Sequence, residues 1–257
     1  MKKQNKKYYL IIGLCLIGAA SFAGIGIYKY LQEKKAGKIY EEIKEEAVVE
    51  ETVEPEQEVQ QPKIEIPIDF ETLQAQNPDI YAWIKIPETN VDYPIVQSSD
   101  DNGYYLNHDI YGEKKAEGAI FTENYNTKTF EDPNTAIYGH DMKNGSMFQS
   151  IHKYMDRSFF DKNREIIVYL PDQILHYEIF AAYLYDNRHL LMSFDFWNKE
   201  EYKRYLDNVF AMRNMNAFID TSMEVTNEDK IITLSTCYAG ISTQRYLVQA
   251  VLVSIEK

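Results

Sequence analysis

The sequence contains two cysteines, Cys15 and Cys237, and their settings decide what a thiol could do here. Cys237 ends a run of apolar and β-forming residues, IITLSTC, whereas Cys15 lies in an uncharged segment near the start of the chain. If Cys15 is buried in lipid, an exported domain with one remaining thiol cannot close an internal disulfide. Cys237 then has two main interpretations, a catalytic nucleophile or a small hydrophobic side chain in the core. A metal site is disfavoured, because no second cysteine and no His-x-x-x-His spacing accompanies it, and we expect no cofactor.

A nucleophilic cysteine needs a nearby base or cation, because an unperturbed thiol is mostly protonated at neutral pH. His140 is the leading candidate among five histidines, since AIYGHDM places it where a predicted strand ends, a common location for catalytic groups. His152 lies on the apolar stripe of a predicted helix and His176 within an alternating strand, and both patterns favour packing or surface roles. His108 and His189 also stay open as alternatives.

Arg245 is the third residue whose position could serve a reaction. Cys237 ends one predicted strand and Arg245 begins the next, with seven residues between them. Antiparallel pairing would set the guanidinium group across from the thiol. A fixed cation there could stabilise the negative charge that develops on a carbonyl oxygen during acyl transfer. The alternative for the same spacing is a surface salt bridge at a strand edge.

The elements that must position these residues are mainly short β-strands. Apolar residues at helical spacing predict two helices, at 145–156 and 198–212, and Pro171-Asp172 predicts a hairpin turn. Eight strands with so few helices favour a mainly β fold, a β-barrel rather than alternating β-α-β units. The predicted strands are 81–87, 91–98, 118–123, 134–140, 164–171, 174–186, 230–237 and 245–255.

The start of the chain has the composition of a membrane segment. Residues 1–7 contain four lysines, and residues 8–28 are 21 positions without a charge, enough to cross a bilayer as a helix. The positive-inside rule predicts a cytoplasmic basic tail at 1–7, a transmembrane anchor at 8–28 and an extracellular remainder. We therefore expect a single-pass protein of the cell membrane. A cleaved signal peptide is the alternative, because Ser21-Phe22-Ala23 is similar to a cleavage site.

Residues 29–63 are predicted to form an acidic, extended linker. The segment from Glu41 to Glu58 contains nine Glu and one Lys, a composition that repels itself and stays open. The whole chain carries a net charge of -13, and no clustered basic face is evident, so nucleic acid is disfavoured as a partner. From about Ile64 the composition is globular, which predicts one domain over 64–257, and we expect a monomer.

Together, TLSTC, YGHDM and an arginine eight positions after the cysteine resemble the sortases, the cysteine transpeptidases of Gram-positive cell surfaces. DNGYYLNHDIYGEKKAEGAIFTENYN and YGHDMKNGSMFQSIHKYMD are similar to class B members, as is a helix near 198–212 before the cysteine strand. The resemblance covers about 64–257. It implies an eight-stranded sortase-type β-barrel with peripheral helices and no cofactor.

The resemblance also implies a reaction and its partners. Cys237 would attack the Thr carbonyl of a C-terminal sorting motif on a secreted protein, His140 would act as acid and base, and Arg245 would stabilise the transition state. The acyl group would pass to an amine of a peptidoglycan precursor or of a pilin. Three neighbouring residues would bind the substrate, although ordinary strand roles are an alternative for the first two: Ser235, Thr236 and Tyr238. Tyr238 stands where class B members often have Asp, which leaves fine substrate preference open.

Other functions remain to be weighed against this resemblance. L,D-transpeptidases place Gly before the cysteine and Arg two positions after it, whereas this chain has Thr236 and Ala239. Papain-like wall hydrolases order the pair as Cys then His, but here every histidine precedes Cys237. A hydrolytic cysteine enzyme of the cell wall and an anchored binding module with an inert thiol are the remaining alternatives.

Overall fold

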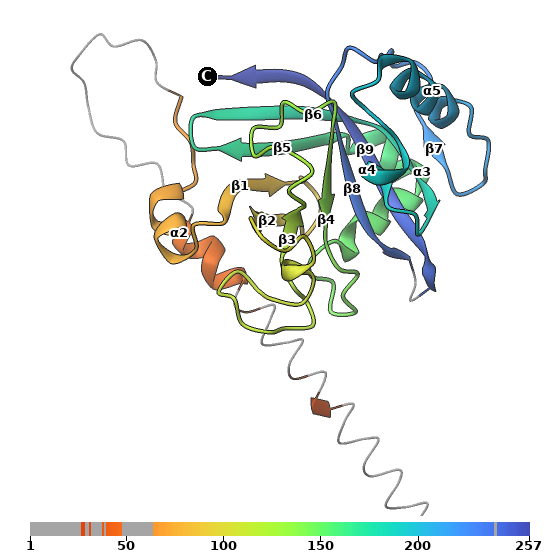
Figure 1. Ribbon diagram of the computed structural model, residues 1–257. Coiled ribbons are helices and arrows are strands. Elements are labelled where there is room, and N and C mark those ends of the chain that lie inside the picture. Colours follow the sequence, from red (N-terminus) through yellow and green to blue (C-terminus); the bar gives the residue numbers. More distant parts are fainter. Residues whose placement is uncertain (1–26, 29–30, 32–37, 39, 48–63, 239–240) are drawn as a thin grey trace, which may run out of the picture. The chain divides into compact units, whose positions relative to one another are not determined.

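The computed structural model describes residues 27–28, 31, 38, 40–47, 64–238 and 241–257, and the chain divides into two compact units, 1–41 and 42–257 (Figure 1). In the larger unit, residues 42–47 are helical. Ile43 and Ala47, which are four positions apart and therefore share a helix face, are buried, and the Ala47 carbonyl accepts a hydrogen bond of 3.0 Å from the Asp69 amide. The predicted extended linker is therefore wrong at 42–47, because these apolar contacts offset the repulsion between glutamates. Residues 48–63 lie outside the described part.

The predicted location in the cell membrane also needs correction. Among the described residues, no helix is long and apolar enough to cross a bilayer. Most of the uncharged run on which that prediction rests, residues 8–26, lies outside the described residues. The prediction of a membrane-spanning anchor with an extracellular domain is accordingly withdrawn.

Eight strands of the larger unit close into a barrel, which confirms the predicted fold class. Around the barrel the order is β5-β1-β2-β3-β4-β8-β9-β6, and β6 pairs again with β5, while the short β7 extends the sheet beyond β6 (Figure 1). Two neighbouring pairs, β2 with β3 and β4 with β8, are parallel. The strands are β1 Ile80–Lys85, β2 Asp92–Val96, β3 Ile120–Thr122, β4 Asn134–Tyr138, β5 Glu165–Leu170, β6 Gln173–Asp186, β7 Phe218–Ile219, β8 Ile231–Tyr238 and β9 Ile241–Glu256.

The predicted hairpin turn is present, because only Pro171 and Asp172 separate β5 from β6, and Leu170 pairs with Gln173. A two-residue connection between antiparallel strands fixes their register. The buried residues of the barrel are mainly apolar, and Trp83 and many Ile and Val residues of the strands are fully buried. This core holds the strand ends that carry the candidate site.

Short helices surround the barrel: α2 Phe70–Gln76, η1 Tyr104–Leu106, η2 Gln149–Met155, α3 Arg157–Lys162, α4 Leu190–Ser193 and α5 Lys199–Phe210. The helix predicted at 198–212 is α5, whose N-cap Asn198 accepts hydrogen bonds from two amides of the first turn. Its apolar face, including Tyr202 and Tyr205, packs in a cluster with Phe180 of β6. The helix predicted at 145–156 is instead the 3₁₀ helix η2. Two residues before its first residue, Met147 has a left-handed backbone (φ 56°), and η2 ends at Met155, just before Asp156, the N-cap of α3.

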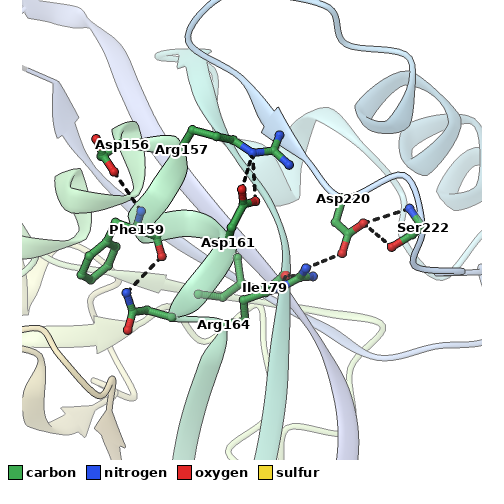
Figure 2. A network of polar contacts seen from close by, with 9 residues as sticks. Asp156, Arg157, Phe159, Asp161, Arg164, Ile179, Asp220 and Ser222 are labelled. Atoms are coloured by element: carbon green, nitrogen blue, oxygen red, sulfur yellow. Dashed lines mark hydrogen bonds and ion pairs between the residues drawn. The ribbon is translucent and has the colours of Figure 1, made fainter.

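A polar network joins the residue just before β5, a residue of β6 and the residues after β7 on one side of the barrel (Figure 2). Arg164 donates from Nε to the Ile179 carbonyl at 2.9 Å and forms an ion pair with Asp220, which also accepts from the Ser222 amide at 2.9 Å. Partial burial raises the pKa of Asp220, but the hydrogen bonds from Ser222 and Arg164 outweigh it and lower that pKa to about 2. The carboxylate therefore stays charged over the physiological range and fixes β7 to the barrel.

Candidate active site

The candidate site forms where three neighbouring strands, β4, β8 and β9, reach one edge of the barrel. In the parallel pair, Tyr138 lies opposite Ser235, and the Gly139 amide donates to the Ser235 carbonyl at 3.2 Å. Two residues further along each strand come His140 and Cys237, so parallel pairing brings both to the same edge. These two residues are 97 positions apart in the sequence, and only the strand register makes them neighbours.

The antiparallel pair supplies the third group. Cys237 of β8 lies opposite Arg245 of β9, which is the pairing that their spacing predicts. The Cys237 thiol is free and partly exposed. Arg245 is also partly exposed, and its Nη1 donates to the Gln244 carbonyl at 3.0 Å. A thiol and a guanidinium group therefore lie on adjacent strands beside an imidazole, a set that could carry out acyl transfer.

A cleft of about 290 Å³ runs along this edge of the barrel. Five of the six residues that the sequence predicts for the site line it: His140, Ser235, Thr236, Cys237 and Arg245. The structure thus brings the predicted nucleophile, base and cation together in a single hollow. Other lining residues come from η1, the end of β3 and the segment after β6, including Leu106, Phe121, Glu123, Asn187, Arg188 and His189.

His140 is held from both its side chain and its main chain. Its Nε2 lies 2.6 Å from the Leu106 carbonyl oxygen, and because a carbonyl only accepts, Nε2 carries the proton in this hydrogen bond. Its own carbonyl accepts from the Phe148 amide at 2.9 Å. Gly139 just before it allows a close approach, since a Cβ there would lie 2.5 Å from Ile120 Cδ1 and 2.7 Å from Phe148 Cγ.

Tyr238, the sixth predicted site residue, does not line the cleft. Its ring lies edge-on to the ring of His152, with a centroid distance of 6.2 Å. The β8–β9 register shifts between Cys237 and Tyr238, so the regular alternation of side chains does not continue across this step. The role of Tyr238 in substrate binding stays a prediction.

A histidine and a carboxylate that the sequence did not pair also meet in this cleft. His189 Nε2 lies 2.7 Å from Glu123 Oε2, and both residues line the hollow beside the predicted nucleophile. His189 follows β6 and Glu123 follows β3, and no spacing rule connects two such distant positions. A polar loop around His189 was the only signal in the sequence.

Among the described residues, no cluster of three or more metal-ligating side chains occurs.

The comparisons with known proteins agree with this geometry. A family model described as a sortase domain matches residues 84–253. The chain belongs to the sortase family. Sortase B of Listeria monocytogenes is 36% identical over 173 residues, which cover 67% of this chain and 68% of that protein. Sortase B of Staphylococcus aureus is 28% identical over 255 residues, which cover 97% of this chain and 98% of that one.

Solved structures of sortase B have the same fold. The crystal structure of sortase B from Bacillus anthracis in complex with AAEK1 has a TM-score of 0.71 at 31% identity and covers 88% of this chain and 99% of that chain. Sortase B of Clostridium perfringens has a TM-score of 0.64 at 31% identity and covers 72% and 100%. The resemblance to class B sortases is confirmed, and this sortase is a cysteine transpeptidase.

Proposed function

We propose that this sortase cleaves a C-terminal sorting motif after its Thr residue and transfers the acyl group to an amine of cell-wall peptidoglycan or of a pilin. The observation that carries the proposal is the pairing of Cys237 with Arg245, beside His140 and along one cleft. The L,D-transpeptidase and inert-module alternatives receive no comparable support from the family. We also expect the enzyme to act as a monomer.

The first half of the reaction forms an acyl-enzyme. The Cys237 thiolate attacks the Thr carbonyl carbon, and the carbonyl oxygen becomes negatively charged next to the Arg245 guanidinium group. The C–N bond of the peptide then breaks, and protonated His140 donates its proton to the leaving amine. Because His140 Nε2 donates to the Leu106 carbonyl at 2.6 Å, the ring must release this bond to donate from Nε2.

In the second half, the acceptor amine attacks the thioester carbon, the C–S bond breaks and a new amide forms. The amine loses a proton to His140, and Cys237 returns as the thiolate, so atoms and charges balance over the cycle. Ser235 and Thr236 lie along the cleft next to Cys237 and are proposed to hydrogen-bond the bound peptide. Water could replace the amine in this step, and the enzyme would then be a hydrolase.

The test supplies peptides of the NPxTx and xPxTG types and varies the acceptor. With hydroxylamine or an amino-terminal cell-wall mimic present, the product should shift from free acid to hydroxamate or amide, and the rate should rise if deacylation limits it. Without an amine, mass spectrometry should detect the peptide bound to Cys237. Brisk turnover to free acid at every amine concentration would show that the enzyme hydrolyses its substrate and does not transfer it.

A further inference from the structure

Each of the three proposed catalytic residues is followed in the chain by a residue whose side chain contacts the same histidine. Asp141 follows His140, Tyr238 follows Cys237, and Tyr246 follows Arg245. All three of these neighbours contact one side chain, that of His152 in η2. None of the three neighbours lines the cleft. His152 therefore does not face the cleft itself. It contacts the site through neighbouring residues whose side chains point away from the cleft.

The contacts of His152 are specific in geometry. Its Nδ1 lies 3.6 Å from Asp141 Oδ1, and its ring centroid lies 5.4 Å from that of Tyr246 and 6.2 Å from that of Tyr238. The side chains of His152 and Asp141 are only 17% and 19% exposed. Two aromatic rings and a carboxylate thus restrict the imidazole, and the imidazole in turn restricts them.

Backbone contacts close the loop that begins at His140, and this loop leads directly into the helix of His152. Asp141 pairs with Met147 as an isolated β-bridge, and the Phe148 amide donates to the His140 carbonyl at 2.9 Å. Met147 has a left-handed backbone (φ 56°), which is uncommon for a residue with a side chain and must be held by its surroundings. η2 starts immediately after this closure, so a shift of His152 would move the base of the loop.

The pKa of His152 reflects both its burial and its polar contacts. Burial lowers the pKa of His152 below its usual range, while the Asp141 carboxylate and a hydrogen bond with the Cys237 main chain act in the opposite direction. The ring therefore has a polar contact to the strand of the nucleophile as well as to the loop of the base. An apolar side chain of similar size would keep the tyrosine packing but lose both polar contacts.

We infer that His152 is a positioning residue, which holds the loop of His140 and the paired strand ends of Cys237 and Arg245 in their relative places. The inference rests on the proposed function, since it assigns no chemistry to His152 itself. A misplacement of about 1 Å between reacting groups can cost on the order of 10²-fold in rate, so even a small shift here should be measurable.

The test compares His152→Leu with His152→Gln, which keeps a side-chain N–H. We expect His152→Leu to lower kcat about tenfold with KM within about twofold, because the cleft itself is unchanged. The rate at which iodoacetamide alkylates Cys237 should change with pH differently from that of the unmodified enzyme, and His152→Gln should recover most of kcat. His176→Leu is the matched control, since His176 of β6 also lies against carboxylates, those of Glu165 and Glu256, but neither of these adjoins a catalytic residue in the chain.

Each outcome separates this inference from the proposed function. If Cys237→Ala is inactive while His152→Leu keeps the kcat and alkylation profile of the unmodified enzyme, the positioning role is wrong and the transpeptidase proposal stands. If Cys237→Ala still turns over peptide, both fail. Should His152→Leu not fold, Asp141→Asn decides, because a normal kcat in that variant would overturn the role and a reduced kcat with normal KM would support it.

Discussion

The two ends of the β8–β9 strand pair differ in whether their buried polar groups are hydrogen-bonded. At the end away from the cleft, here called the inner end, Gln249 Nε2 donates to Thr233 Oγ1 at 2.8 Å and to the Tyr205 hydroxyl at 2.7 Å. Tyr183 donates to Gln249 Oε1 at 3.0 Å. Toward the cleft, Thr236 lies opposite Tyr246, and both are buried. Neither of these two hydroxyl groups has a hydrogen-bond partner within the described part of the chain.

The difference separates a structural region from a functional one on the same strands. A fully satisfied buried network fixes register and adds stability, whereas a buried hydroxyl without a partner costs free energy. Sequences tend to break such local rules at sites that serve a function. We therefore expect changes at the cleft end to reduce activity with little loss of stability, and changes at the inner end to do the opposite.

The largest effect is expected at the catalytic residues. Cys237→Ala should abolish turnover of a sorting-motif peptide, and His140→Ala and Arg245→Ala should each reduce kcat/KM by about 10²-fold or more. All three side chains are partly exposed, so thermal unfolding should change little. Near-normal turnover in Arg245→Ala would show that this residue takes no part in the reaction. Unfolding of any of the three variants would contradict the expectation that the cleft end serves activity and not stability.

A substitution at the inner end should have the reverse signature. Gln249→Leu leaves three buried partners short of a hydrogen bond, and we expect unfolding in urea to show a loss of about 2–3 kcal/mol with normal activity per folded molecule. Thr236→Val on the same strand pair is the matched control. It removes a buried hydroxyl without a partner, so the free energy of unfolding should stay the same or rise, although KM would rise if Thr236 binds substrate.

The smallest effect is expected at the polar network of Figure 2, outside both ends of the strand pair. Asp220→Asn should lower the free energy of unfolding by about 1–2 kcal/mol at pH 7, because Arg164 loses its charged partner. Since the pKa is about 2 in the folded protein and 3.8 is the ordinary value for Asp, this stabilisation is present above about pH 3.8 and is lost as the pH falls toward 2. Urea unfolding from pH 7 to pH 3 measures it, and a difference that stays constant over that range would contradict the assignment.

Local patterns in the sequence predicted elements whose residues are close in the chain. The helix α5 follows from apolar residues at helical spacing and an Asn198 cap, and the β5–β6 hairpin follows from Pro171-Asp172. The pairing of Cys237 with Arg245 could also be predicted, because seven residues between two strands leave few antiparallel registers. These predictions succeed because short-range geometry limits the choices.

Predictions that depended on distant packing were less successful. The position of Tyr238 against His152 and outside the cleft lining was not predicted, because it depends on which face of β8 meets the cleft. The helix at 42–47 was missed, because its acidic composition suggests an open chain until Ile43 and Ala47 are covered. His152 was interpreted as a packing residue, and only the structure places the neighbours of three candidate catalytic residues around it.

By itself, the sequence determined the types of the reacting groups and the strands that carry them. A free thiol at a strand end, an imidazole after another strand and an arginine eight positions beyond the thiol could all be named without coordinates. The tertiary structure decided that β4 and β8 run parallel in a register that brings His140 to the edge occupied by Cys237. The physical reason is that pairing between strands almost a hundred residues apart depends on how the whole barrel closes, and no local propensity encodes that closure.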